Sequence, residues 1–166
     1  MIEIIEGNLL ESGCTFICHQ VNCKKAMGRG IAGQIRQKWP KVYEDYCYNI
    51  DYMYENDFVK QSSDLLGMIS WTELEDNKYI MNFFSQDEYY PRDRCHTDYK
   101  AFTKCCKALK DFIEEYKLNK NDIIIGFPYK IGCGLAGGDW NIVYNIIEEE
   151  FADYSVKIYK LKEEEN

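Results

Sequence analysis

The sequence predicts one α/β domain with a central six-stranded sheet, and three observations support this fold class. Six short apolar runs, rich in β-branched and aromatic residues, are typical of strands that are buried on both faces. Amphipathic patterns of helical length lie between several of these runs. The 166 residues are also enough to bury a core without disulfides or a structural metal. The expected strands are residues 2–5, 15–21, 65–71, 79–84, 123–127 and 156–161, and the expected helices are residues 30–38, 41–48, 98–116 and 139–151.

No stretch rich in proline, glycine or serine divides the chain, and no internal repeat is visible, so we expect residues 1–166 to form a single domain. Hydrophobic residues make up 46% of the chain and aromatic residues 15%, which is too apolar for a disordered protein. The formal charge of −8 disfavours a long nucleic acid as the main ligand, because such binding needs a basic face. A small anion is still permitted, since backbone N–H groups at the start of a helix can bind phosphate.

The chain begins without a basic segment followed by a long apolar stretch, and no run approaches the roughly 18 residues of a membrane span. Eight cysteines without an export signal are better interpreted as reduced thiols than as a disulfide framework. We therefore expect a cytoplasmic protein that does not contact a membrane.

The first glycine loop, residues 21–32, joins a buried strand to a helix that begins near Gly30. Gly28 and Gly30 lack the Cβ atoms that would keep a ligand away from the backbone. The start of the helix supplies unpaired N–H donors and the positive end of its dipole, which suits a phosphate or a ribose. A plain strand-to-helix turn is the alternative, since glycines are common at such turns.

The second glycine loop, residues 126–140, also leads from a buried strand into a helix. It contains four glycines within the seven residues 132–138, and Asp139 is placed to cap the helix that follows. Successive N–H groups of such a loop can surround a diphosphate. The glycine spacing matches neither the Walker pattern nor a GxGxxG motif in a first βα unit, so a conventional nucleotide-binding fold is disfavoured.

A zinc site is conceivable at Cys14, Cys18, His19 and Cys23, because thiolates and imidazoles are zinc ligands. A strand sends neighbouring side chains to opposite faces, and these residues do not form the closely spaced pairs typical of zinc sites. We expect no metal.

Four motifs, in this order along the chain, resemble the macro domain family, and the resemblance covers nearly the whole sequence. The motifs are Gly7-Asn8-Leu9-Leu10, His19-Gln20-Val21-Asn22-Cys23, Met27-Gly28-Arg29-Gly30-Ile31-Ala32 and Ile131-Gly132-Cys133-Gly134-Leu135-Ala136-Gly137-Gly138-Asp139-Trp140. The resemblance implies a three-layer αβα fold with a mixed, mostly parallel sheet. It also implies that ADP-ribose or a derivative lies across the carboxyl edge of the sheet, without a cofactor, and that the partners include ADP-ribosylated macromolecules.

The resemblance assigns roles to individual residues. Asn8 holds the place of the aspartate that accepts from the adenine amino group, and because an amide can also donate, the preference for adenine is less fixed here. Asn22 contacts the distal ribose, the two glycine loops enclose the diphosphate, and residues 83–93 border the distal ribose. The expected ligand-binding residues are Asn8, Leu9, Asn22, Met27, Gly28, Gly30, Ile31, Ala32, Gly132, Cys133, Gly134, Leu135, Ala136, Gly137 and Gly138.

Two catalytic mechanisms of the family make different demands on this sequence. Members that remove ADP-ribose from acidic side chains use a lysine and an aspartate, and those places are held here by Phe83 or Phe84 and by Ala136. A phenylalanine cannot replace an amine nucleophile, which disfavours that mechanism. The branch that hydrolyses ADP-ribose-1''-phosphate uses a histidine at the place of His19, and Asp139 is the candidate acid or base partner.

Both candidates also have structural interpretations: His19 can be a buried strand residue held by a hydrogen bond, and Asp139 a helix cap. The preferred expectation is an ADP-ribose-1''-phosphate phosphatase-like hydrolase. A non-catalytic ADP-ribose reader is the first alternative, and a hydrolase of ADP-ribosyl or O-acyl-ADP-ribose bonds that works without a catalytic lysine is the second.

Overall fold

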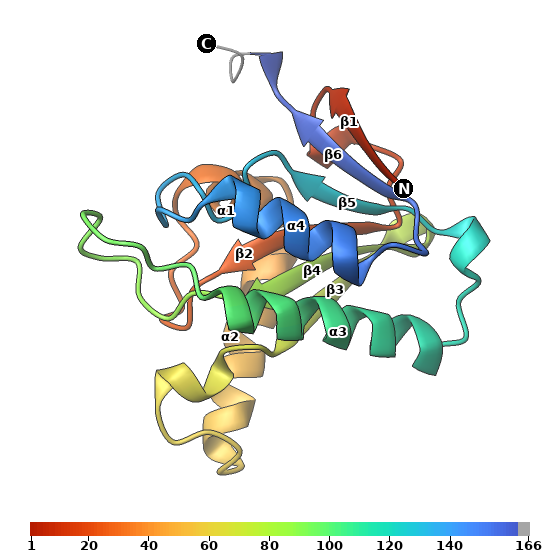
Figure 1. Cartoon of the computed structure of the whole chain (residues 1–166). Helices are drawn as coiled ribbons and strands as arrows, with labels where there is room; N and C mark the ends of the chain where they lie inside the picture. Colours follow the sequence, from red (N-terminus) through yellow and green to blue (C-terminus); the bar gives the residue numbers. More distant parts are fainter. Residues whose placement is uncertain (163–166) are drawn as a thin grey trace.

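A computed structural model of the chain describes residues 1–162 and shows one six-stranded sheet with the order β1-β6-β5-β2-β4-β3 (Figure 1). All neighbouring pairs are parallel except β3 and β4, which are antiparallel. The sheet is therefore mixed and mostly parallel, as predicted. The strands are β1 (Ile2–Glu6), β2 (Phe16–Val21), β3 (Ile69–Leu74), β4 (Lys78–Phe84), β5 (Ile125–Pro128) and β6 (Val156–Lys160).

Four helices cover the two faces of the sheet, which gives three αβα layers (Figure 1). They are α1 (Gly30–Lys38), α2 (Pro40–Glu55), α3 (Tyr99–Glu115) and α4 (Trp140–Glu150), and the short 3₁₀ helices are η1 (Leu9–Glu11), η2 (Ser62–Leu65), η3 (Glu75–Asn77) and η4 (Lys120–Asp122). Within residues 1–162, no helix is both long enough and apolar enough to cross a membrane.

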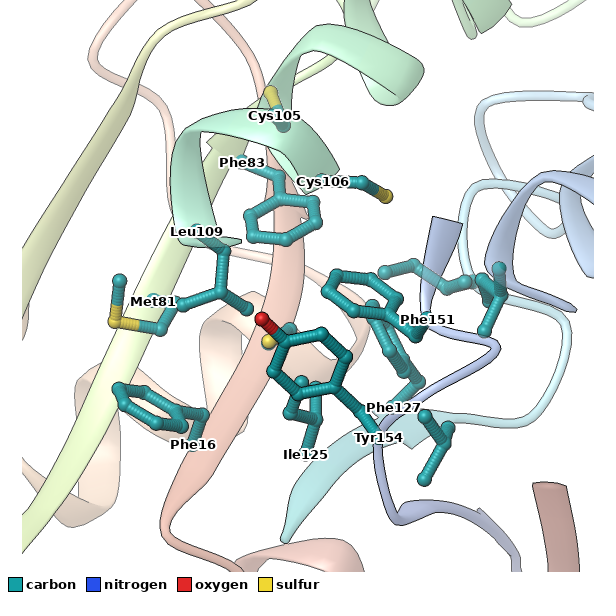
Figure 2. Packing of buried hydrophobic residues seen from close by; sticks show 14 of the residues in the cluster. Phe16, Met81, Phe83, Cys105, Cys106, Leu109, Ile125, Phe127, Phe151 and Tyr154 are labelled. Atoms are coloured by element: carbon teal, nitrogen blue, oxygen red, sulfur yellow. The ribbon is translucent and has the colours of Figure 1, made fainter. Parts of the chain in front are cut away.

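Alternation along the strands divides the apolar side chains between two cores. On one face, Phe16 and Cys18 of β2 join the buried faces of α3 and α4, and Figure 2 shows the aromatic side chains of this core packed closely together. On the other face, Ile17 and Val21 join α1 and α2. The odd-numbered residues of β2 therefore face α1 and α2, and the even-numbered ones face α3 and α4.

Two sequence predictions are corrected. The strand expected at residues 65–71 begins at Ile69, because residues 62–65 form η2, which Gln61 and Asp64 stabilise with a reciprocal capping box. Gly67 follows in the left-handed region (φ +93°), so the chain turns before β3 begins. The helix expected at residues 41–48 extends from Pro40 to Glu55. Residues 163–166 of the expected domain lie outside the described part of the chain.

Candidate functional site

The two glycine loops line one cavity of about 850 Å³ at the carboxyl ends of β2 and β5. This is the position at which open α/β sheets bind ligands. Segments 26–32 and 128–136 form much of its wall, and Gln86, Tyr89 and Arg92 contribute from the segment that follows β4. The arrangement places loops that are about a hundred residues apart in the sequence around the same space.

The first glycine loop supplies the N-terminus of α1. Gly30, Ile31 and Ala32 form the first turn of this nine-residue helix, and their N–H groups have no hydrogen-bond partner within residues 1–162. Arg29 occupies the N-cap position, and its side chain makes no capping bond. All three N–H groups belong to residues that line the cavity, so this end of the helix can donate to a ligand there.

Asn22 and Tyr46 hold the start of the first glycine loop in place. The side-chain Oδ1 of Asn22 accepts from the N–H groups of Lys24 (2.9 Å) and Ala26 (3.2 Å), and its Nδ2 donates to the Ala26 carbonyl (2.7 Å). Tyr46 of α2 donates to the Asn22 carbonyl (2.6 Å). Asn22 lines the cavity and keeps one Nδ2 hydrogen without a partner in the described residues, so it can donate to a ligand.

The second glycine loop presents a comparable set of donors without a helix. The N–H groups of Gly134, Leu135 and Ala136 have no partner among the described residues, and all three residues line the cavity. At the base of the loop, the Gly138 N–H donates to the Gly132 carbonyl (2.9 Å). Gly132 and Gly137 both have positive φ values (+75° and +74°), which favours glycine at these two turns.

The cavity is electrostatically distinct from the rest of this acidic chain. Arg29, Arg92 and Lys130 line it, whereas none of the described residues that line it is an aspartate or a glutamate. Arg29 and Arg92 make no ion pair with any side chain that the structure describes. Unpaired peptide donors together with unpaired cations make this cavity suited to an anionic ligand.

Comparison with known proteins identifies the family. The family model described as the Macro domain matches residues 18–147, which is most of the chain. The chain belongs to the macro domain family. The match begins within β2, ends within α4 and includes both glycine loops.

Individual relatives of this macro domain are distant but match over most of its length. It is 27% identical, over 80% of this chain and 77% of the other, to an uncharacterized 17.5 kDa protein of Enterobacteria phage T4. It is 26% identical to an ADP-ribose 1''-phosphate phosphatase of Saccharomyces cerevisiae, with 96% of this chain and 98% of the other covered. Among solved structures, Thermosipho africanus DarTG in complex with ADP-ribose superposes with a TM-score of 0.73 at 16% identity, covering 98% of this chain and 42% of the other.

His19 of the macro domain does not line the cavity. It is fully buried, and its Nε2 lies 2.6 Å from Oδ1 of Asn82 on the neighbouring strand β4. Burial lowers the pKa of His19 to about 4, so the imidazole is neutral at physiological pH. Because His19 is odd-numbered in β2, it faces the α1 and α2 layer, and no described contact links it to the cavity. This geometry agrees with the structural interpretation of His19 and gives no support to the catalytic one.

Other predicted site residues also lie outside the cavity lining. Asp139 caps α4 by accepting from the Asn141 N–H (2.9 Å), as its structural interpretation predicts. Asn8 caps the short helix η1 by accepting from the Leu10 N–H (3.0 Å), and Leu9 is buried in the α1 and α2 core. Gly137 and Gly138 form the base of the second glycine loop. The remaining predicted residues line the cavity: Asn22, Met27, Gly28, Gly30, Ile31, Ala32, Gly132, Cys133, Gly134, Leu135 and Ala136.

The positions considered for a catalytic lysine lie in the two cores. Phe83 and Phe84 are fully buried on opposite faces of the sheet, so neither contributes to the cavity. Cys133 lines the cavity, but burial and the nearby Asp139 carboxylate raise the pKa of its thiol to about 11, which disfavours a thiolate nucleophile. Among the side chains that the structure describes, no group of three or more histidine, cysteine, aspartate or glutamate residues could hold a metal ion.

Several cavity residues were not identified as site residues from the sequence. Gln20 follows His19 in β2 and therefore points to the opposite face, where it reaches the cavity. Arg29 lies between two predicted glycines, and its position at a helix start was the signal that could have revealed it. Arg92 lies in the segment 83–93, which the family resemblance places beside the distal ribose, but no residue pattern singled out Arg92 within that segment.

Proposed function

We propose that this macro domain binds ADP-ribose or a derivative of it, with the diphosphate held between the two glycine loops. The observation that carries the proposal is the pair of three-residue N–H runs, 30–32 and 134–136, that line one cavity. Each run offers successive donors, and the first adds the positive end of a helix dipole. The volume of about 850 Å³ is within the usual range for a cavity that encloses a small organic ligand.

The charges of the cavity support an anionic ligand. ADP-ribose carries two phosphate charges, and the described residues that line the cavity include Arg29, Arg92 and Lys130 but no aspartate or glutamate. In a chain with a formal charge of −8, a carboxylate-free cavity concentrates the favourable potential at the site where the diphosphate is proposed to bind. Two relatives support the same ligand class, since one is an ADP-ribose 1''-phosphate phosphatase and the other was solved in complex with ADP-ribose.

Hydrolysis is the second candidate function, and similarity to ADP-ribose 1''-phosphate phosphatases favours it. The cavity itself supports binding better than catalysis. None of the described residues that line it is a histidine, aspartate or glutamate, so it lacks the usual general bases. Asn22 and Gln86 both line the cavity, and a water oriented by either of them is one route to hydrolysis there.

Calorimetric titration with ADP-ribose tests the binding proposal, with AMP and inorganic phosphate as shorter ligands. We expect a micromolar dissociation constant for ADP-ribose and much weaker binding of AMP, since AMP lacks the diphosphate and the distal ribose. Equal affinities for AMP and ADP-ribose would show that the second glycine loop does not contact the ligand. No binding of ADP-ribose at millimolar concentration would refute the proposal.

Phosphate release from ADP-ribose-1''-phosphate separates a hydrolase from a reader. If the protein is a hydrolase that orients water through the loops, we expect turnover in the wild type and in His19→Gln, because His19 does not reach the cavity. Loss of turnover in His19→Gln, with ADP-ribose affinity retained, would restore the catalytic interpretation of His19. Release of ADP-ribose from modified protein or DNA, and deacylation of O-acyl-ADP-ribose, test the other hydrolase activities in the same way.

A further inference from the structure

A polar network that extends from the cavity wall to Thr97 and Ser85 fixes the base of the second glycine loop. Thr97 is buried just before α3, and its hydroxyl donates to the Gly132 carbonyl (2.6 Å). The same hydroxyl oxygen accepts from Nε2 of Gln20 (3.0 Å). Oε1 of Gln20 in turn accepts from the hydroxyl of the buried Ser85 (2.6 Å).

The donors and acceptors of this network have only one consistent arrangement. Nε2 of Gln20 donates one hydrogen to the Thr97 hydroxyl oxygen and the other to Oε1 of Gln86 (2.9 Å). The only hydrogen of the Thr97 hydroxyl is therefore directed to the Gly132 carbonyl. Since Thr97 and Ser85 are buried, removing one of these bonds leaves a polar group without water to replace the partner.

The network acts on the peptide groups that shape the loop. The Gly132 carbonyl accepts from both Thr97 and the Gly138 N–H, so it is directed towards the base of the loop. The Ala136 carbonyl also has a hydrogen-bond partner, since it accepts from the His96 N–H (2.7 Å). With these carbonyls held by residues 96–97, the N–H groups of residues 134–136 are left for the cavity.

The packing at the base of the loop is equally close. A Cβ atom built on Gly132 would lie 2.9 Å from Oε1 of Gln20 and 3.1 Å from the Thr97 hydroxyl oxygen. A Cβ atom built on Gly138 would lie 2.6 Å from the Gly132 carbonyl oxygen. Because Gly132 and Gly138 lack Cβ atoms, the backbone of the loop can lie close to Gln20 and Thr97, and the Gly132 carbonyl can accept from the Thr97 hydroxyl.

We infer that Thr97 is a positioning residue for ligand binding, which acts through the Gly132 carbonyl to hold the N–H groups of the second glycine loop in their donating arrangement. Thr97 does not line the cavity, whereas Gln20 and Gln86 do, so the network joins the cavity wall to the base of the loop. The inference rests on the proposed function, because it assumes that residues 134–136 contact the ligand.

The test compares Thr97→Val, Thr97→Ser and the control Thr103→Val in the full chain. Valine keeps the shape of threonine but cannot donate, and serine restores the hydroxyl. The Thr103 hydroxyl also donates to a backbone carbonyl (that of Tyr99, 2.9 Å), but Thr103 lies within α3 and does not line the cavity. We expect Thr97→Val to weaken ADP-ribose binding by roughly tenfold, with Thr97→Ser and Thr103→Val close to the wild type.

Amide hydrogen exchange without ligand gives a second readout that is independent of binding. The reporters are the Gly138 amide, which donates to Gly132, and the His96 amide, which donates to Ala136. We expect faster exchange at both amides in Thr97→Val but not in Thr103→Val. Unchanged exchange, or faster exchange with unchanged affinity, would overturn the inference. If the wild type failed to bind ADP-ribose, the proposed function would be wrong, whereas exchange would still show whether Thr97 holds the loop.

Discussion

The two glycine loops present the same kind of donor set but form it by different means. In the first loop, Gly30, Ile31 and Ala32 are the opening turn of α1, so the hydrogen bonds of the helix fix the direction of their N–H groups. In the second loop, residues 134–136 belong to no helix or strand. Their arrangement depends on glycines with positive φ and on backbone hydrogen bonds within the loop, among them Gly138 N–H to Gly132 and Gly137 N–H to Gly134.

The supports of the loops differ in the same way. Helix α2 supports the first loop, since Tyr46 donates to Asn22 and Tyr43 donates to the Lys25 carbonyl (3.0 Å). The second loop is supported by the irregular residues 96 and 97, which bond to its carbonyls. A donor set that is part of a helix should tolerate local changes, whereas one built from a loop should depend on single residues.

The largest expected effect on ligand affinity comes from adding one methyl group to the second glycine loop, and the same change in the first loop is the comparison. Gly138→Ala places a Cβ 2.6 Å from the Gly132 carbonyl oxygen, a backbone atom that cannot move aside, whereas the Cβ of Gly28→Ala meets nothing within 4 Å. We expect Gly138→Ala to weaken ADP-ribose binding by roughly a hundredfold, since such overpacking costs about 1–3 kcal/mol. Gly28→Ala should weaken binding less than Gly138→Ala, measured by calorimetry, because its Cβ displaces no protein atom and can meet only the ligand. Similar losses in both variants would remove the proposed difference between the loops.

Lowering the pH should reduce the free energy of unfolding through His19, which is buried on the face of the sheet that α1 and α2 cover. The pKa of His19 is lowered to about 4 by burial, whereas an unfolded histidine has a pKa near 6.5, so between these values the unfolded chain binds more protons. Stability is therefore lost as the pH falls through this window, by about 2 kcal/mol from roughly pH 7.5 to pH 5. Urea denaturation of the wild type and of His19→Gln at both pH values measures this difference. If both proteins lost stability in parallel, the neutral buried state assigned to His19 would be wrong.

A carboxylate introduced into either loop tests whether both face the same anion. Gly28 and Gly134 have open space at the Cβ position and no positive φ, so Gly28→Glu and Gly134→Glu add charge without backbone strain. We expect each to weaken ADP-ribose binding by roughly tenfold to a hundredfold through repulsion in a carboxylate-free cavity, and the corresponding glutamine variants to lose less.

The control for these charges is Gly13→Glu, at a glycine that also has open space but lies away from the cavity. It should bind ADP-ribose like the wild type. If only one of the two loop glutamates weakened binding, the diphosphate would be held by that loop alone.

The sequence predicted the fold well because burial has a strong sequence signal. Strands buried on both faces appear as continuous apolar runs, which located β2, β4 and β5 to within two residues at each end. The strand predicted at 65–71 begins later because Leu65 of η2 and its C-cap Leu66 are apolar and resemble the start of a strand. The capping box of η2 consists of common residues, so its hydrogen bonds are visible only in the structure. Glycine spacing also located both loops of the cavity.

The side chains of the site were harder to predict than its backbone. His19 and Gln20 are neighbours in one strand and point to opposite faces. Val21 shares the face of His19 but lines the cavity, so both alternation and nearness to the carboxyl end of β2 determine which side chains reach it. The sequence alone does not show which helices cover each face of β2, so it cannot assign the odd-numbered and even-numbered side chains to a face. Arg92 and Thr97 come from a segment with no periodic pattern. The position of Thr97 depends on its hydrogen bond to Gly132 of the second glycine loop, which forms only on folding, and Arg92 reaches the cavity lining only in the folded chain.

The smallest expected effect concerns the helix that supports the first loop. Tyr46→Phe removes the hydroxyl that donates to the buried Asn22 carbonyl. We expect a loss of about 1 kcal/mol in the free energy of unfolding, measured by urea denaturation, because that carbonyl loses its partner. ADP-ribose affinity should fall only a few fold, since the bonds from Lys24 and Ala26 to the Asn22 side chain persist and α1 retains its first turn.

Tyr79→Phe is the matched control, because the Tyr79 hydroxyl has no hydrogen-bond partner among the groups that the structure describes, and its ring packs against Phe16 and Phe112. The informative comparison is with Thr97→Val, which removes one buried hydroxyl from the support of the other loop. If Tyr46→Phe weakened ADP-ribose binding as much as Thr97→Val, the helical hydrogen bonds of α1 would not keep its first N–H groups oriented after the Tyr46 hydroxyl is removed. The two loops would then be equally dependent on the residues beneath them, because the ladder of hydrogen bonds in α1 would add nothing to the orientation of its first turn.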